Sequence, residues 1–249
     1  MRYLLSRAEK PVLERLATER TLCAFDFDGT LAPIVERPED AEMRPETRKL
    51  LEQLASRFPC VILSGRAGSD VAAKVGDVGV ERILGNHGAE IAPDAAKIQP
   101  TIARWQTELQ EKLSRLEGAW IENKGLSLAV HYRQATNKPV ARKRILAAAR
   151  EISSARVFSG KQVVNLTTKE APHKGAALAA ERNRLGCEWV LFVGDDDNDE
   201  DAFAIGGNLI ATRVGRKRQS RARYYLRNQL EIDRLLDYLV KLRDRPNLC

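Results

Sequence analysis

Short, fully apolar runs recur along the chain, and each ends at a polar or glycine-containing turn. They read TLCAFDFDGT (21–30), CVILSGR (60–66), RILGNHGAE (82–90), WVLFVGDDD (189–197) and NLIATRVG (208–215). Each run is too short for a typical helix, and its lack of interspersed polar residues is typical of a parallel strand buried on both faces.

Helical patterns lie between these runs. Residues 44–57, 174–185 and 228–243 each gather apolar side chains on one face: Leu50, Leu51 and Leu54, then Ala177, Leu178 and Leu185, then Leu235, Leu236, Leu239 and Val240. Strands that alternate with helices predict a doubly wound α/β fold with a parallel sheet. The first 20 residues mix charged and apolar positions and predict a short helix.

The middle of the chain follows a different pattern. Residues 101–116 have helical spacing, and the next segment, AWIENKGLSLAVHYR (119–133), predicts a hairpin that turns at 123–125. A helix over 138–153 and a second hairpin, ARVFSGKQVVNLTT (155–168), turning at 159–161, complete the region. Two helix–hairpin units predict a separate α+β domain at 94–168, inserted into a core built from 1–93 and 169–249.

Composition narrows the class of protein. The chain has 249 residues, is 43% hydrophobic and 30% charged, and contains no apolar run of about 18 residues that would span a membrane. The N-terminus lacks the features of a signal peptide, so we expect a cytoplasmic protein. Cysteines 23, 60, 187 and 249 form no Cys-x-x-Cys pair, and the first three lie in or beside apolar runs, as small buried residues do.

The net charge of +7 is concentrated near the C-terminus. No acidic residue interrupts a basic stretch made of Arg213, Arg216, Lys217, Arg218, Arg221, Arg223 and Arg227. This stretch fits a solvated loop and helix start, or a surface that attracts anionic substrates. Contact with nucleic acid, aided by the two tyrosines at 224 and 225, is the less favoured alternative.

Polar residues terminate the predicted strands. They are Asp26 and Asp28, Ser64, and Asp195 with Asp199. In an open parallel sheet the carboxyl ends of the strands meet at one crevice, so these side chains are expected to converge there. Carboxylates that converge repel one another unless a cation lies among them, and a ligand set made only of oxygen atoms favours Mg²⁺.

Simpler explanations exist for these acidic motifs. Asp26 and Asp28 alternatively fit an ordinary strand-ending turn. If they instead hold a metal and a phosphoryl group, Gly29 allows the chain to turn sharply and to expose backbone N–H groups toward an anion. Residues 195–199 resemble the start of a calcium-binding loop, but Glu200 occupies the sixth position, where that loop requires glycine. An acidic helix start accounts for Glu200 and Asp201 but not for Asp195 directly after an apolar run.

The motifs DFDGTL, a serine closing the second strand, a later lysine and GDDDND occur in the order found in haloacid dehalogenase-type phosphatases. The finer set DFDGTLAPI, SGR, NHGAE, IENKGLSLAVHYR, KGAAL and GDDDNDEDAF resembles the trehalose-6-phosphate phosphatase family. The resemblance implies a Rossmann-like core of the haloacid dehalogenase type, and it identifies the inserted domain as the cap that closes over the site.

The resemblance also implies roles for individual residues. Asp26 is the nucleophile that takes the phosphoryl group, and Asp28 is the acid and then the base. Ser64 hydrogen-bonds a phosphoryl oxygen, and Lys174 neutralises the phosphoryl group and Asp26. Mg²⁺ is held by Asp26, the Asp28 carbonyl and Asp195, with Asp199 in support.

The substrate residues follow the same resemblance. They are Gly29, Gly65, Arg66, Asn86 and His87 in the core and Glu122, Lys124 and Arg133 in the first hairpin. His87 fits equally well a residue that braces a turn. The charged residues of the hairpin alternatively fit a solvated turn. His131 fits a structural role better than a catalytic one. The glutamate that this family commonly carries before the motif lysine has its match near Asn165–Leu166, and Asn198 stands where threonine is usual.

These features predict a monomeric, Mg²⁺-dependent hydrolase that converts trehalose 6-phosphate into trehalose and phosphate through a phosphoaspartate. The alternatives are a related phosphatase for glucosylglycerol phosphate, mannosyl-3-phosphoglycerate or sucrose phosphate, a phosphomutase that uses the same phosphoaspartate, and a nucleic-acid-binding module that uses the basic stretch. The expected partner is a small sugar phosphate, with no membrane partner.

Overall fold

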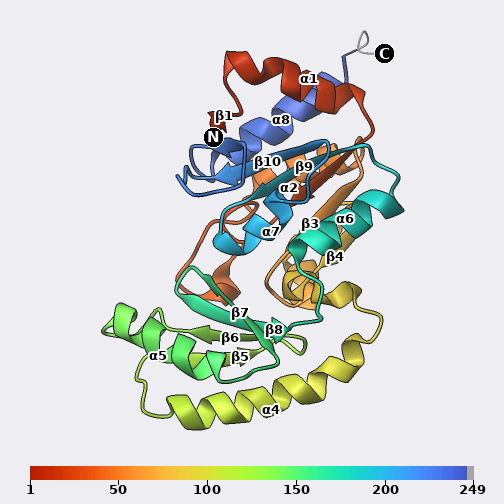
Figure 1. Ribbon diagram of the computed structural model, residues 1–249. Coiled ribbons are helices and arrows are strands. Elements are labelled where there is room, and N and C mark those ends of the chain that lie inside the picture. The colour runs from red at the N-terminus through yellow and green to blue at the C-terminus, as the bar shows by residue number, and fades with distance from the viewer. Residues whose placement is uncertain (246–249) are drawn as a thin grey trace.

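The computed structural model describes residues 1–245, and its core is a seven-stranded sheet in which every strand pair is parallel (Figure 1). The strands are β1 (Arg2–Tyr3), β2 (Thr21–Phe25), β3 (Cys60–Leu63), β4 (Arg82–Leu84), β9 (Trp189–Gly194), β10 (Leu209–Val214) and β11 (Tyr224–Leu226). Their order is β1-β11-β10-β9-β2-β3-β4. The predicted strands therefore form one sheet, and β2 and β9 are central neighbours.

Helices cover both faces of this sheet because its strands are apolar on both sides. Leu22 and Ala24 pack toward α6 (Lys174–Arg184) and α7 (Glu200–Phe203), whereas Cys23 and Phe25 pack toward the opposite face. That opposite face is covered by α1 (Lys10–Thr18), α2 (Pro45–Ala55), α3 (Gly68–Val75) and α8 (Glu231–Arg243). Burial on both faces explains why these strands are mostly apolar.

The cap contains a separate antiparallel sheet in the order β5-β6-β8-β7. It is built from α4 (Ala95–Leu113), β5 (Trp120–Asn123), β6 (Leu128–His131), α5 (Lys138–Arg150), β7 (Ala155–Gly160) and β8 (Val163–Thr168). Leu128, Val130 and Val164 pack one face of this sheet against α4 and α5. The other face is directed toward the core (Figure 1). The predicted fold class, a parallel-sheet core with an inserted α+β cap of two helix–hairpin units, is confirmed.

Some local predictions were wrong. Arg2 and Tyr3 form the edge strand β1 by pairing with β11, so only the later part of the first 20 residues is helical. The basic stretch is not a loop that leads into a helix, because it contains the end of β10 and all of β11. The second hairpin turns at 161–162 rather than 159–161, and α4 begins six residues before the predicted start.

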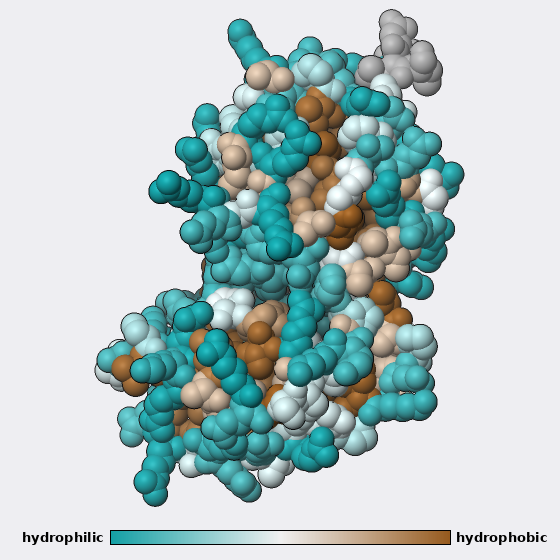
Figure 2. Space-filling view, viewed as in Figure 1, coloured by the Kyte–Doolittle hydropathy of each residue, from teal (hydrophilic) through white to brown (hydrophobic). Residues whose placement is uncertain are grey.

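Short elements complete the chain. In the described part of the chain, four 3₁₀ segments connect the regular elements: η1 (Arg7–Glu9), η2 (Pro38–Asp40), η3 (Asn86–Ile91) and η4 (Asp197–Asp199). Cys23, Cys60 and Cys187 are buried free thiols, as predicted, whereas Cys249 lies outside the described residues, as does the end of the predicted core segment. Most of the face in Figure 2 is hydrophilic. Within residues 1–245, no helix combines the length and apolar character needed to cross a bilayer.

Candidate active site

Three carboxylates from distant parts of the chain meet at the carboxyl ends of the central strands. Asp26 directly follows β2 and Asp195 directly follows β9, and these strands pair with Phe25 opposite Val193. Asp199 comes from η4, the next turn of the chain. One carboxylate oxygen of each lies within 4.8 Å of the others, and all three residues are buried. The adjacent strand ends therefore create the predicted acidic crevice.

Lys174, the first residue of α6, is the buried cation of this cluster. Its Nζ donates to Asp26 Oδ1 and to Asp199 Oδ1, each at 2.7 Å, and its side chain is 1% exposed. Burial by itself would lower the pKa of Lys174, but the charges of Asp199 and Asp26 outweigh it and raise that pKa above its ordinary value. Lys174 therefore stays charged and neutralises one of the three carboxylates.

Two backbone N–H groups hold the second carboxylate oxygen of Asp199. Its Oδ2 accepts the N–H groups of Asp195 and Asp196, both at 2.9 Å, so the carboxylate closes the acidic loop on itself. With both oxygens occupied, Asp199 positions the loop and Lys174. Burial raises the pKa of Asp195 to about 6, with Lys161 opposing that shift, and burial also raises the pKa of Asp26 well above its ordinary value against the effect of Lys174.

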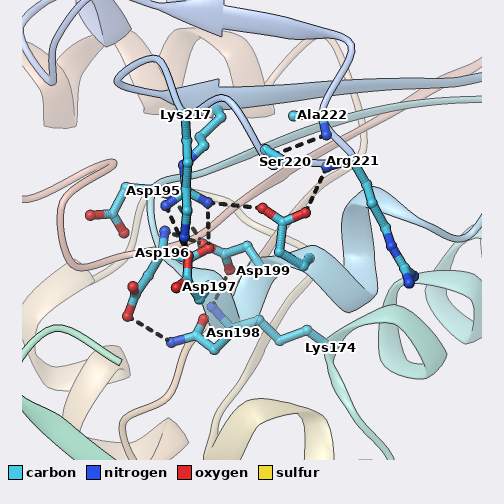
Figure 3. A network of polar contacts seen from close by, with 12 residues as sticks. Lys174, Asp195, Asp196, Asp197, Asn198, Asp199, Lys217, Ser220, Arg221 and Ala222 are labelled. Carbon is cyan, nitrogen blue, oxygen red and sulfur yellow. Dashed lines mark hydrogen bonds and ion pairs between the residues drawn. The ribbon is translucent and has the colours of Figure 1, made fainter. Parts of the chain in front are cut away.

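The basic stretch braces this acidic loop from the neighbouring strand. Figure 3 shows Lys217 reaching down to the acidic loop, where it pairs with Asp197. Arg213 donates to the Asp196 carbonyl at 2.8 Å and to Glu200 at 3.1 Å, and the Arg221 N–H donates to Glu200 at 2.7 Å. Part of the positive charge of the basic stretch therefore stabilises the acidic loop beside the acid cluster.

Gly29 lets the chain pass close to Asp195. Its φ of +81° favours glycine, and a Cβ at this position would lie 2.1 Å from Asp195 Oδ2. Any side chain here would displace the carboxylate. The glycine in the motif therefore creates room in the acid cluster.

The donor set fits a divalent cation. Asp26, Asp195 and Asp199 offer only oxygen atoms, which suits a hard metal ion. Lys174 and Lys161 supply two positive charges against three negative ones, so the cluster keeps a net negative charge. Asp28 lies outside this cluster, although its side chain faces the same cavity.

Arg66 holds Asp28 instead. Arg66 Nε donates to Oδ2 of Asp28 at 2.7 Å and Nη2 donates to Oδ1 at 2.8 Å, a two-point pair, while Nη1 bonds Asp70. Burial would lower the pKa of Arg66, but the hydrogen bonds and charges of the two aspartates raise it. The arginine thus fixes the direction of the Asp28 side chain.

The predicted site residues that follow β3 and β4 gather beside this pair. Ser64 is fully buried, and its Oγ accepts the Arg66 N–H at 3.2 Å without lining the cavity. Gly65 is packed against His87, whose ring would lie 2.4 Å from a Cβ there. Asn86 Oδ1 accepts a hydrogen bond from Ser127 of the cap at 2.7 Å.

His87 is a buried imidazole without polar partners. Among the described residues, no group hydrogen-bonds either ring nitrogen, and the ring faces the cavity. Burial, with the charges of Lys124 and Lys174, lowers the pKa of His87 well below its ordinary value. Its φ of +57° is unusual for a residue with a side chain, and such backbone strain is frequent at functional sites.

The first cap hairpin reaches the core through its charged residues. Lys124 Nζ donates to the Gly65 carbonyl at 3.0 Å and lies 3.6 Å from Glu122, and Arg133 donates to the Glu36 carbonyl at 3.1 Å. Burial would raise the pKa of Glu122, but the hydrogen bond to His131 and the charge of Lys124 lower it. These side chains are therefore not free in solvent.

A cavity of about 380 Å³ lies between the cap and the strand ends. It is lined by Asp26, Asp28, Asp195, Gly65, Arg66 and His87 of the core and by Glu122, Lys124 and Arg133 of the cap. Ser64, Asn86, Gly29, Lys174 and Asp199 lie outside its lining. The predicted residues are thus arranged as a lining and a supporting layer.

Several lining residues were not predicted from the sequence. Lys161 at the tip of the second hairpin pairs with Asp195, and its N–H donates to Asp196 at 3.1 Å. Asn165 of β8 and Trp120 and His131 of the first hairpin also line the cavity. The residue pattern predicted both hairpins. Alternation of side chains along each strand was the signal that could have placed Trp120, His131 and Asn165 on the face directed at the core.

Comparison with known proteins agrees with this arrangement. Residues 24–227 match the sequence profile of the trehalose-phosphatase family. A trehalose-phosphate phosphatase of Mycobacterium ulcerans is 34% identical over 215 residues, covering 80% of this chain and 55% of that protein. One from Mycobacterium bovis is 36% identical over 200 residues, covering 74% and 50%. The chain thus spans about half the length of these relatives.

Solved structures show the same fold. The C-terminal domain of Candida albicans trehalose-6-phosphate phosphatase superposes with a TM-score of 0.78 at 21% identity, covering 93% of this chain and 96% of that one. The Aspergillus fumigatus trehalose-6-phosphate phosphatase gives a TM-score of 0.63 at 25% identity, covering 97% and 99%. Because the profile match covers most of the sequence, the chain belongs to the trehalose-phosphatase family.

Proposed function

We propose that this protein is a phosphoric monoester hydrolase that converts trehalose 6-phosphate into trehalose and phosphate. The observation that carries the proposal is the acid cluster of Asp26, Asp195 and Asp199 around buried Lys174. Two of its members, Asp26 and Asp195, line the same cavity as the charged cap hairpin. The cluster suits phosphoryl transfer, and the hairpin suits a ligand rich in hydroxyl groups. Family membership supports the choice of sugar.

Asp26 is the proposed nucleophile. A carboxylate oxygen of Asp26 bonds to phosphorus while the bond from phosphorus to the sugar oxygen breaks, which leaves an aspartyl phosphate. Lys174 lies 2.7 Å from Asp26 Oδ1 and offsets the negative charge that gathers at the phosphoryl oxygens. Ser64 and the backbone around Gly29 and Gly65 are the proposed supports for those oxygens.

Asp28 is the proposed acid and base. It gives a proton to the departing sugar oxygen, then takes one from the water that attacks the aspartyl phosphate, and this releases phosphate and restores Asp26. The carboxylate is paired with Arg66, so these roles require it to turn toward the leaving oxygen when the substrate fills the cavity.

Mg²⁺ is the proposed cofactor, held by the Asp26 and Asp195 side chains and the Asp28 carbonyl, with Asp199 in support. When bound, the ion supplies positive charge that polarises the phosphoryl group. The all-oxygen donor set and its net negative charge support this choice.

The cap, residues 94–168 in our proposal, closes the site against water. Glu122, Lys124 and Arg133 are the proposed contacts to sugar hydroxyls, together with Arg66, Asn86 and His87 of the core. The contacts of Lys124 and Arg133 with core carbonyls support a closed arrangement that needs both parts. We also propose a monomer, since one chain supplies every residue invoked.

A second candidate is a phosphatase for a different sugar phosphate, such as glucosylglycerol phosphate, mannosyl-3-phosphoglycerate or sucrose phosphate. The observation that favours it is Asn165, an amide that lines the cavity near the position where the family commonly has glutamate. The phosphoryl chemistry is the same for both candidates.

A phosphate-release panel tests the proposal. We expect Mg²⁺-dependent release from trehalose 6-phosphate, and a kcat/KM for it at least about tenfold above those for the other three sugar phosphates, which corresponds to about 1.4 kcal/mol. Chelation by EDTA should abolish the release, and added Mg²⁺ should restore it. Equal turnover of all the compounds would contradict the trehalose assignment, and transfer of phosphate back to sugar without release would indicate a mutase.

A further inference from the structure

A large aromatic residue is left partly exposed at the wall of the cavity. Trp120, the first residue of β5, is 44% exposed and lines the cavity, whereas Trp105 is buried in the cap core. Leaving an indole in contact with water forgoes the free energy that its burial would contribute. An exposed aromatic side chain at a cavity wall therefore points to a ligand that covers it.

The ring of Trp120 is held in place by its neighbour across the strands. Trp120 lies directly opposite His131 in the β5–β6 pair, and their rings stack with centroids 4.0 Å apart and planes inclined by 12°. His131 Nε2 in turn lies 2.8 Å from Glu122 Oε2. The stack and this hydrogen bond give the indole a defined orientation, as a preorganised contact surface requires.

Polar groups surround this aromatic surface on the same face of the cap sheet. Trp120 and Glu122 alternate along β5, so their side chains share the face directed at the core, and Lys124, directly after β5, also lines the cavity. A pyranose ring has a flat face of C–H groups and a rim of hydroxyl groups. The C–H face suits the electron-rich face of an indole, and the rim suits a carboxylate, an ammonium or an amide.

The position of Trp120 indicates which part of a ligand it meets. Trp120 pairs with His131 and His131 pairs with Val163, so two strand spacings, roughly 10 Å, separate Trp120 from β8. At the β8 side, Lys161 contacts Asp195 of the acid cluster. The aromatic surface therefore lies across the cavity from the carboxylates, beyond the part that receives a phosphoryl group.

We propose that Trp120, backed by His131, is a stacking platform for the sugar ring that does not carry the phosphate. The inference rests on the proposed function only in taking the substrate to be a sugar phosphate. It makes Trp120 a specificity residue that favours a disaccharide phosphate over a monosaccharide phosphate.

Binding measurements in the Asp26→Asn background test the platform without hydrolysis. Trehalose 6-phosphate and glucose 6-phosphate differ by the second ring, and calorimetry gives a Kd for each. Adding Trp120→Ala should raise the Kd of trehalose 6-phosphate about tenfold and leave that of glucose 6-phosphate within about twofold. Trp120→Phe, which keeps an aromatic ring, should recover most of the affinity. Val140→Ala, at an exposed apolar position of α5 outside the cavity, is the matched control.

Kinetics provide a second readout. With Asp26 intact, Trp120→Ala should raise the KM for trehalose 6-phosphate about tenfold while kcat stays within about twofold, because the platform acts far from the reacting atoms. If Trp120→Ala reduced the affinity for trehalose 6-phosphate and glucose 6-phosphate equally, or for neither, the proposed stacking role of Trp120 would be wrong. If the wild-type protein released phosphate from no sugar phosphate, the proposed function would fail, whereas ring-dependent binding in the Asp26→Asn background would still support the platform.

Discussion

At the scale of single residues, the candidate active site is a balance of buried charges. Asp26, Asp195 and Asp199 approach within hydrogen-bonding range of two lysines, one from α6 and one from the cap. Burying a charge is costly unless it is paired, so each member of this set depends on the others. Substitutions that remove a charge at these positions should therefore affect function and stability differently.

Asp26→Asn should abolish turnover while the fold persists. The amide has nearly the shape of the carboxylate and removes one of three crowded negative charges, but it cannot form the aspartyl phosphate. Phosphate release and thermal unfolding measure the two effects, with Asp77→Asn on an exposed turn as the control. Measurable turnover in Asp26→Asn would exclude Asp26 as the nucleophile.

Lys174→Met should destabilise the protein strongly. The change removes the shared partner of Asp26 and Asp199 and leaves two buried carboxylates without their cation, which costs about 3–5 kcal/mol in comparable cases. Urea unfolding in EDTA measures the loss of unfolding free energy. Lys143→Met on the exposed face of α5 controls for the loss of a lysine, and a difference below about 1 kcal/mol between the two variants would contradict the pairing.

At the scale of elements, the turn after β2 decides whether the cluster can form. Gly29 has the positive φ of a left-handed turn, and its hydrogen atom faces Asp195. Arg213, in β10, and Lys217, in the loop that follows it, brace the acidic loop after β9. Turns at the ends of three neighbouring strands thus set the positions of side chains that the strands alone would leave undefined.

Gly29→Ala should disrupt the cluster beyond the cost of its backbone angle. Gly215 has a φ of +80°, almost equal to the +81° of Gly29, but a Cβ at Gly215 meets no atom within 4 Å. Gly215→Ala therefore measures the backbone cost alone, about 1–2 kcal/mol. Gly29→Ala should cost more unfolding free energy and should weaken Mg²⁺ binding measured by calorimetry. Equal effects of the two substitutions would mean that Asp195 moves aside freely.

At the scale of the whole molecule, the cap is joined to the core by polar contacts around the cavity and by a small apolar cluster of Leu126 with Ala89 and Ala171. Lys124, Ser127, Arg133, Arg156 and Lys161 each reach a group of the core. His87 of the core also meets Phe158 of the cap edge-on, with ring centroids 4.8 Å apart. A junction of polar contacts and one small apolar cluster holds two bodies together less firmly than a large shared apolar core does.

Ser127→Ala should loosen this junction without altering the cavity lining. Ser127 is 1% exposed, and its loss leaves the buried Asn86 oxygen without its donor, at a cost of about 1–3 kcal/mol. Faster hydrogen exchange in the cap hairpins and a raised KM for every sugar phosphate are expected, in contrast to the disaccharide-specific effect of Trp120→Ala. Ser153→Ala, at an exposed position after α5, is the control, and unchanged exchange rates would contradict a stabilising role for this contact.

Much of the fold and site could be predicted because the signals are local. An apolar run that ends in Asp26 or Asp195 indicates a buried strand and an acidic strand end, and parallel strands bring such ends together. The edge strand β1 and its neighbour β11 escaped prediction because each has only two or three residues, and β1 pairs with β11 across more than 200 positions of sequence. Lys161 was missed because a lysine at a hairpin tip is usually solvated.

The sequence by itself determined the alternation of strands and helices, the inserted hairpins and the acidic residues at the strand ends. These follow from residue periodicity and turn chemistry within short segments. Only the tertiary structure decided that Lys174 is shared between two carboxylates, that Asp28 is held by Arg66 and that Trp120 stacks on His131. Such contacts depend on strand register and on how the cap sits over the core, and both are set by packing between segments far apart in the chain.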